Sequence, residues 1–73
     1  MIEFTQEEVD SFKRNGWCSP SGVTWHEELY CPGGMGFALI KEPGISKEQI
    51  DRTKAWLRSQ RDVVHFMMAK VKK

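Results

Sequence analysis

Cys18, His26, Cys31 and His65 are the residues of this 73-residue chain that could hold a soft metal or form a nucleophile–base pair. A structural zinc site needs four such ligands and a catalytic one three. Their spacing lacks the C-x-x-C knuckle that is specific for zinc. A Cys–His pair also needs an orienting third group and a pocket that excludes water, which a short chain has little bulk to build. We therefore expect a protein that is not an enzyme, with no catalytic residue, no metal and no cofactor. Whether Cys18 and Cys31 are free, paired or metal-bound stays open.

Basic residues concentrate at the end of the chain, where residues 46–73 hold eight of the eleven lysines and arginines. On a helical projection most of them share one narrow stripe with a histidine. Its members are Lys47, Lys54, Arg58, Arg61, His65 and Lys72. Such a stripe is either a solvated face or a surface for phosphates or for an acidic protein. Phe66 projects on the other side, away from the apolar face, as a lone exposed ring or an aromatic contact.

The first element expected to position these residues is a helix near residues 6–15. Thr5 and Glu8 have the spacing of a capping box, in which each side chain hydrogen-bonds the other's backbone N–H. Phe4 and Val9 occupy the positions of a hydrophobic staple around it. Gly16 is suited to end the helix, because glycine adopts positive φ without strain.

A β-hairpin is expected next. Residues 23–30 alternate between apolar and polar side chains, and residues 35–41 form an extended, mostly apolar stretch. Pro32-Gly33-Gly34 separates the two runs. The glycines of residues 33–36 precede an apolar strand rather than a helix, so they indicate a hairpin loop and not a phosphate cradle.

A long helix is expected to follow, near residues 47–70. Ser46 and Gln49 repeat the capping box, and no glycine or proline occurs from Lys47 to Lys73. Such a helix would be about 35–40 Å long. Its core face would hold Ile50, Trp56, Leu57, Val63, Val64, Met67, Met68 and Val71, interrupted by Thr53 and Gln60. The seven-residue spacing of positions 50, 57, 64 and 71 would also allow a coiled-coil homodimer.

These elements predict an α+β fold: a small single domain spanning residues 1–73 in α-β-β-α order. The β-hairpin would pack against a short N-terminal helix and a long C-terminal helix, because a two-stranded sheet is not stable alone. This order resembles the N-terminal docking domains of some modular peptide synthetases. The matching stretches are Glu7 to Gly16, Phe37-Ala38-Leu39-Ile40, and Ser46 onward. In its brevity the chain also resembles the small proteins of phages and mobile elements.

The function expected from the sequence is binding. No apolar run approaches the ~20 residues of a membrane span, and no signal peptide is visible, so a soluble cytoplasmic protein with no membrane partner is expected. We expect a non-catalytic protein-binding module, regulator or adaptor that acts through its long C-terminal helix. The alternative is a nucleic-acid-binding accessory protein that uses the basic stripe. The partner-binding residues would be Lys47, Lys54, Arg58, Arg61, His65, Phe66 and Lys72.

Overall fold

The computed structural model describes residues 2–30, 34–60 and 65–72. Within these ranges the chain forms strands and helices in the order β-α-β-β-α-β. They are β1 (Ile2–Thr5), α1 (Gln6–Arg14), β2 (Thr24–Tyr30), β3 (Gly34–Lys41), α2 (Lys47–Gln60) and β4 (Phe66–Lys72).

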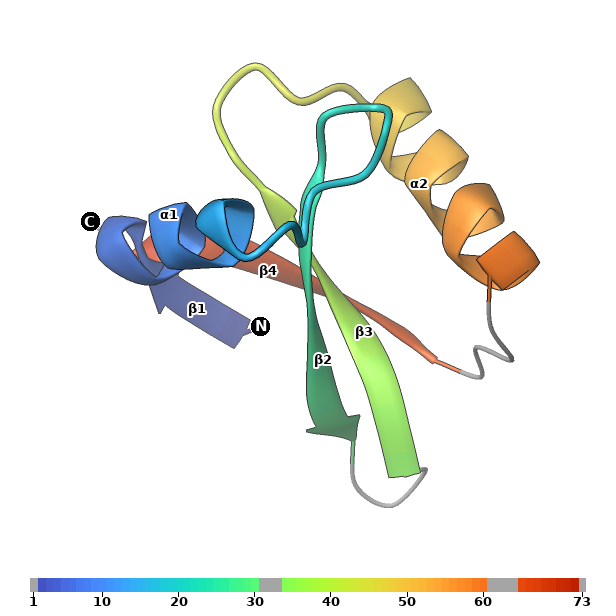
Figure 1. The fold of residues 1–73 in the computed structure, drawn as a ribbon, viewed down its shortest axis with the longest axis horizontal. Coiled ribbons are helices and arrows are strands. Elements are labelled where there is room, and N and C mark those ends of the chain that lie inside the picture. The colour runs from blue at the N-terminus through green and yellow to red at the C-terminus, as the bar shows by residue number, and fades with distance from the viewer. Residues whose placement is uncertain (1, 31–33, 61–64, 73) are drawn as a thin grey trace.

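The strands form one mixed sheet in the order β1-β4-β3-β2 (Figure 1). β1 runs parallel to β4 and β4 runs parallel to β3, whereas β2 and β3 form an antiparallel hairpin. The last strand of the chain therefore lies inside the sheet, between the first strand and the hairpin. The parallel neighbours β3 and β4 are joined by α2, as a parallel pair requires a long crossover connection.

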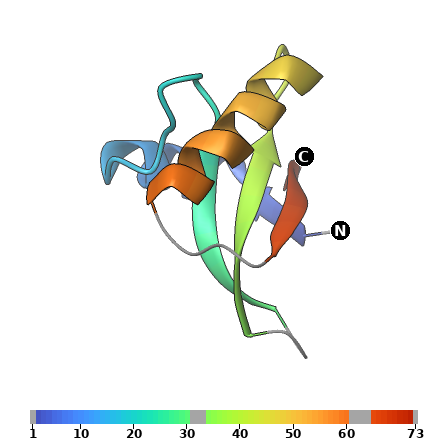
Figure 2. The same ribbon diagram turned by 90° about the vertical axis from the view of Figure 1, so that its right-hand side faces the viewer.

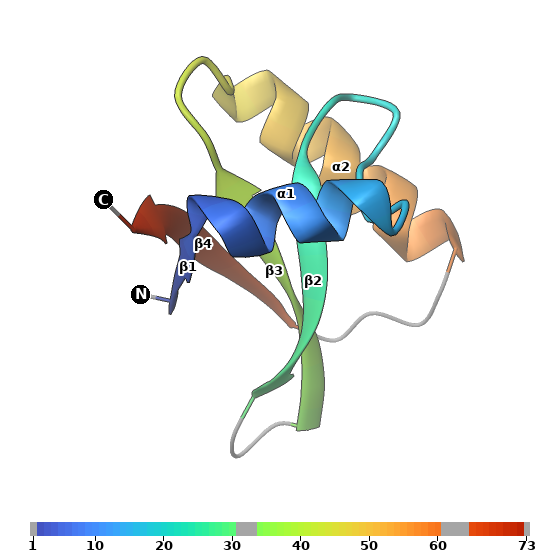
Figure 3. The same cartoon turned by 60° about the vertical axis from the view of Figure 1, so that its left-hand side comes forward.

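The two helices cover opposite faces of the sheet, because side chains alternate along each strand. In β3, Phe37 and Leu39 pack in the cluster that includes α2. Ala38 and Ile40 pack in the cluster that includes α1. Figure 3 shows α1 in front of the strands and α2 behind them. Burial on both faces explains why the sequence of β3 is a continuous apolar run and not an alternating one.

The apolar core is thus divided in two by the sheet. On the α2 face the buried residues are Val23, Trp25, Phe37, Leu39, Ile50 and Leu57. On the α1 face they are Phe4, Val9, Ala38, Ile40 and Ala69. None of these side chains is more than 7% exposed. Each half-core is small, so the fold needs both helices in place.

The two predicted helix starts are confirmed. Thr5 Oγ1 accepts a hydrogen bond from the backbone N–H of Glu8 at 3.1 Å, and Glu8 Oε1 accepts one from Thr5 N–H at 3.0 Å. At α2, Gln49 N–H donates to Ser46 Oγ at 3.2 Å and Ser46 N–H donates to Gln49 Oε1 at 2.8 Å. The hairpin is confirmed as well, with residues 24–30 paired to residues 34–40.

The prediction of a long C-terminal helix is wrong. α2 ends at Gln60, and residues 66–72 form β4 instead. In β4, Phe66 and Met68 pack on the α2 face, while Ala69 and Val71 pack on the α1 face. Helix propensities of ordinary residues differ by less than about 1 kcal/mol, so burial of both faces of β4 outweighs them. The longest dimension of the described residues, 29 Å, is also shorter than the expected helix.

The predicted α-β-β-α order is wrong for a related reason. β1 and β4 add two strands that the sequence analysis did not include, and they pair with each other from Ile2↔Ala69 to Thr5↔Lys72. The sheet consequently has enough width for a helix on each face, which gives three layers. The heptad seam does not exist either, because Ile50 and Leu57 are buried within this chain and Val71 belongs to β4. Val63 and Val64 lie outside the described residues.

The coverage of the two faces is unequal. Figure 2 shows α2 lying across β2 and β3, while the carboxyl end of β4 lies to its side. The side chains that β1 and β4 direct to this face near their carboxyl ends are exposed, so α2 does not cover this part of the sheet; they are Glu3, Thr5, Lys70 and Lys72. Among the described residues, no helix has the length and apolar character needed to cross a membrane.

Candidate functional site

The basic stripe predicted on one helix does not exist as a single surface. Lys47, Lys54 and Arg58 lie on α2, but His65 precedes β4 and Lys72 is at the far end of that strand. Arg61 lies outside the described residues. In Figure 1 the carboxyl end of β4 lies at the left, near α1, whereas α2 lies at the right. The structure therefore separates Lys72 from the three basic residues of α2.

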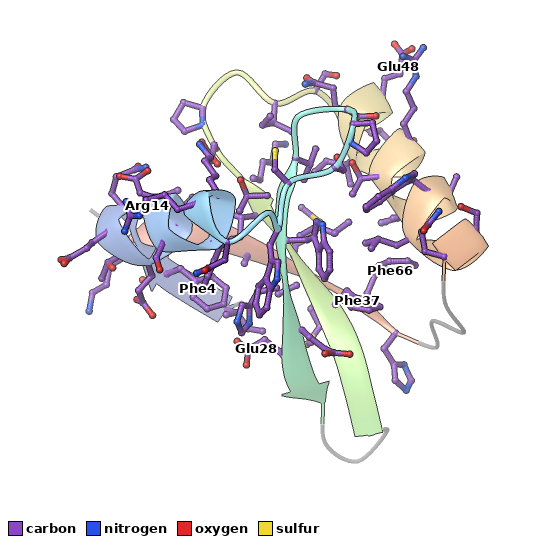
Figure 4. All side chains as sticks on the ribbon, in the orientation of Figure 1. Phe4, Arg14, Glu28, Phe37, Glu48 and Phe66 are labelled. Atoms are coloured by element: carbon purple, nitrogen blue, oxygen red, sulfur yellow. The ribbon has the colours of Figure 1, made fainter. Side chains whose placement is uncertain are left out.

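Phe66 is not the outward ring expected from the helical projection. It is half-buried in β4 and packs against the core cluster that contains Phe37. Figure 4 shows the two rings beneath α2. The guanidinium carbon of Arg58 lies 4.9 Å from the centre of the Phe66 ring, within cation–π range. Both residues thus contribute to the attachment of α2 to the sheet.

The cysteine and histidine residues are also dispersed. Cys18 is exposed, and its thiol lies 3.7 Å from the carbonyl oxygen of Ser19. His65 is half-buried at the start of β4, and Cys31 lies outside the described residues. In the part of the chain that the structure describes, no three side chains of the metal-ligating types gather into a cluster.

His26 belongs to an aromatic cluster on the α1 face. Its ring stacks on Phe12 with centroids 4.3 Å apart and lies 4.2 Å from Trp17. His26 Nδ1 is 3.0 Å from Glu28 Oε1. Trp17 also stacks on Trp25, whose side chain belongs to the opposite core, and its carbonyl accepts a hydrogen bond from Trp25 N–H. The cluster therefore wraps the edge of β2 and links the two half-cores.

A different part of the sheet has the geometry of a binding site. β1, β4 and β3 are parallel, so their carboxyl ends meet at one edge. After β1 the chain continues into α1 on one face, and after β3 it continues into α2 on the other. In open α/β sheets, ligands bind at the carboxyl ends of strands where the connections diverge in this way.

A depression of about 650 Å³ lies at this edge. Segment 42–45, which connects β3 to α2, forms one wall, and β4 forms another. The lining residues are Gln6, Lys41, Glu42, Pro43, Gly44, Ile45, Lys70, Val71 and Lys72. We call Lys41, Lys70 and Lys72 the lysine edge.

The three lysines share one face of the sheet. Lys41 continues the alternation of Phe37 and Leu39, and Lys70 and Lys72 continue that of Phe66 and Met68. They therefore project on the face that α2 covers elsewhere, beyond the end of its coverage. All three are exposed.

Like charges are placed directly beside each other at the lysine edge. Lys41 and Lys70 are register partners on neighbouring strands, and Lys72 is two residues further along β4. Like charges opposite each other in a sheet destabilise it by a few tenths of a kcal/mol up to about 1 kcal/mol. Lys70 has a partial counterion in Glu3 of β1, at 3.5 Å. Among the described residues, no acid forms an ion pair with Lys41 or Lys72.

Glu42 lines the depression, but its carboxylate is engaged elsewhere. Glu42 Oε2 accepts from Lys13 Nζ at 2.8 Å, and Glu42 Oε1 accepts from Thr24 Oγ1 at 3.0 Å. The hydrogen bond to Glu42 raises the pKa of Lys13 above its ordinary value, against a smaller lowering effect of burial. Glu42 therefore ties α1 to β2 and does not compensate the charge of the lysine edge.

Lys41 and Lys70 are not among the site residues predicted from the sequence. The sequence pattern predicts Lys41 at the end of a hairpin strand, and it predicts a helix near residues 47–70 on which Lys70 lies outside the basic stripe. The signal that could have found the site is the alternation Lys70-Val71-Lys72, which is typical of a strand with one apolar and one solvated face.

Comparison with known proteins adds no relative, because no protein-family model, curated protein or solved structure matches the chain. The resemblance to synthetase docking domains depended on an α-β-β-α order that the fold does not have. The site is therefore interpreted from its own residues.

Proposed function

We propose that this protein is a non-catalytic binding module that docks an acidic segment of a protein partner on the lysine edge. The observation that carries the proposal is the placement of three lysines around a depression at the carboxyl ends of parallel strands. Their mutual repulsion costs folding free energy, and an acidic ligand would relieve it. The binding surface differs from the long helix expected from the sequence, which does not exist.

The aliphatic part of the lining favours a protein partner over nucleic acid. Pro43 and Ile45 provide apolar contact beside the lysines. A protein segment presents acidic and aliphatic side chains together, whereas single-stranded nucleic acid is held largely by stacking of bases on aromatic rings. The described lining has no aromatic side chain.

The same lining supports binding without catalysis. Its described residues include no histidine, cysteine, serine or threonine, and its three lysines are exposed, whereas a lysine nucleophile is commonly activated by burial in an apolar pocket. Its one carboxylate, that of Glu42, already has two hydrogen-bond donors.

The proposal is tested with labelled probes and fluorescence anisotropy. The probes are a ten-residue peptide of alternating glutamate and leucine, a single-stranded oligonucleotide and a DNA duplex of matched charge. Wild type is compared with a triple variant, Lys41→Gln/Lys70→Gln/Lys72→Gln. The matched control is Lys47→Gln/Arg52→Gln/Lys54→Gln on α2, which removes the same charge.

We expect the peptide to bind wild type and the α2 control alike, and the lysine-edge variant about three- to a hundredfold more weakly. Each exposed ion pair contributes about 0.2–1 kcal/mol, and about 1.4 kcal/mol corresponds to tenfold in affinity. Equal loss in the two triple variants would mean that net charge alone drives binding. Tighter binding of either oligonucleotide than of the peptide would favour the nucleic-acid alternative.

A further inference from the structure

The lysines of the lysine edge form a compact triangle. Lys41 and Lys70 occupy paired positions on adjacent strands, which are about 4.8 Å apart. Lys70 and Lys72 are two residues apart on one strand, or about 6.6 Å. Each ammonium group ends a flexible four-carbon stem, so the three groups can converge on a single point.

The net charge of the three lysines and Glu3 matches that of a phosphate monoester better than that of a carboxylate. Three ammonium groups and the nearby carboxylate of Glu3 give a net charge of about +2. A phosphate monoester carries about −1.5 to −2 near pH 7 and offers three acceptor oxygens, whereas a carboxylate carries only −1 and two oxygens. One phosphate group can accept hydrogen bonds from all three lysines at a single point. The carboxylates of an extended peptide lie on separate residues, so they cannot bind the three lysines in this way.

We infer that the lysine edge is a binding subsite for a phosphate monoester carried on a serine or threonine of the protein partner. The inference deepens the proposed function and rests on it. Lys41, Lys70 and Lys72 contact the phosphate oxygens, and the residues that flank the phosphorylated residue pack on Pro43 and Ile45. Glu3 competes with the phosphate for Lys70 and thereby limits affinity.

The test compares four probes against the whole chain by two-dimensional NMR. They are a phosphoserine peptide with leucine on each side, the same peptide with serine, the same peptide with glutamate, and inorganic phosphate. At pH 7.5 we expect the phosphopeptide to bind at least tenfold more tightly than the glutamate peptide. The largest amide shifts are expected at residues 41, 70 and 72, with no comparable shifts at Lys47.

Two further measurements separate recognition of phosphate from attraction by charge. Lowering the pH to 5.5 adds a proton to most of the phosphate, whose second pKa is about 6, and should weaken the phosphopeptide severalfold more than the glutamate peptide. Removal of the competing carboxylate by Glu3→Gln should strengthen phosphopeptide binding about two- to fivefold. Lys41→Gln should weaken it at least threefold, with Lys47→Gln as the unchanged control.

The outcomes distinguish this inference from the proposed function. If the glutamate peptide shifts the same amides and binds as tightly as the phosphopeptide, the phosphate inference is wrong and the acidic docking surface stands. If inorganic phosphate binds as tightly as the phosphopeptide, the site takes free phosphate and the assignment to a protein partner is overturned. If no probe shifts the amides of the lysine edge, both proposals are wrong.

Discussion

Because Lys41 pairs with Lys70, we expect the substitution Lys41→Glu to raise stability and to weaken binding. Lys41→Glu replaces a like-charge cross-strand pair with an opposite-charge pair, so that Glu3 and the introduced carboxylate flank Lys70. The change removes a repulsion and adds an attraction, each about 0.2–1 kcal/mol. The two effects together give about 0.4–2 kcal/mol. The side chain of Lys70 is 56% exposed, which places the expected gain in the lower part of that summed range, at about 0.5–1 kcal/mol. For a domain of this size the melting temperature should rise by about 2–8 °C.

The assay is thermal unfolding followed by circular dichroism at about 20 mM and 1 M salt. The gain should shrink at high salt, where the Debye length falls to about 3 Å. A cycle of Lys41→Gln, Lys70→Gln and the double variant isolates the coupling between the two side chains. A Lys41→Glu protein no more stable than wild type at low salt would refute the reasoning, as would a coupling of zero. The same variant should bind acidic probes less well than wild type.

Other predictions concern the core and the ions. Leu57→Ala, at a side chain 1% exposed, should lower the free energy of unfolding by about 2–5 kcal/mol in urea titrations, with Ala55→Ser on the exposed face of α2 as a near-neutral control. Thr53→Val should cost about 1–3 kcal/mol, because Thr53 Oγ1 lies 2.8 Å from Ser19 Oγ in a buried contact; an unchanged urea midpoint would show that this hydrogen bond is energetically silent. The folded pKa of Lys13 is raised above 10.5, so the contribution of its pair with Glu42 is present below that pH and lost as the pH rises through the folded pKa. Wild type should therefore lose more stability than Lys13→Gln as the pH rises from about 10 to about 12. Treatment with a strong chelator under reducing conditions should leave the circular dichroism spectrum unchanged, and loss of the folded signal would mean that a metal is required.

Local signals in the sequence were sufficient for the parts of the fold that are determined by neighbouring residues. The capping box of Thr5 and Glu8 has both partners within one turn, and so does that of Ser46 and Gln49. The β2–β3 hairpin is likewise a local structure, because only three residues separate its two strands in the sequence. Each of these elements could be inferred without knowledge of the rest of the chain.

The remaining strands could not be inferred in this way, because they depend on pairing between distant segments. Ile2–Thr5 is too short to be distinguished from the lead-in to a helix, and its register partner, Ala69–Lys72, has good helix formers among its residues. One feature of the sequence did indicate the missing strands. Residues 37–40 are all apolar, so both faces of this strand are apolar. That pattern is typical of a strand inside a sheet and not of a two-stranded hairpin with one open face, and the structure buries these residues on both faces.

The candidate site was missed for the same reason. Lys41 and Lys70 are far apart in sequence and become neighbours only through the parallel pairing of β3 with β4. On a helical projection Lys70 lies outside the basic stripe. The prediction of a helix at residues 66–70 therefore did not group Lys70 with Lys41 and Lys72. The error in the secondary structure of residues 66–72 thus carried directly into the choice of site residues.

The position of β4 has a consequence for how the molecule is synthesised and folds. β4 follows the other elements in the chain but lies between β1 and β3 in the sheet. Until it is synthesised, β1 has no strand to pair with, and one edge of β3 presents unpaired backbone groups beside apolar side chains. Such an edge is a template for pairing with other chains. The pairing of Ile2 with Ala69 also closes nearly the whole chain into a loop, and non-local contacts of this kind slow folding. A nascent chain should therefore remain prone to aggregation until β4 has left the ribosome, and truncations before residue 66 should be recovered mainly as insoluble protein.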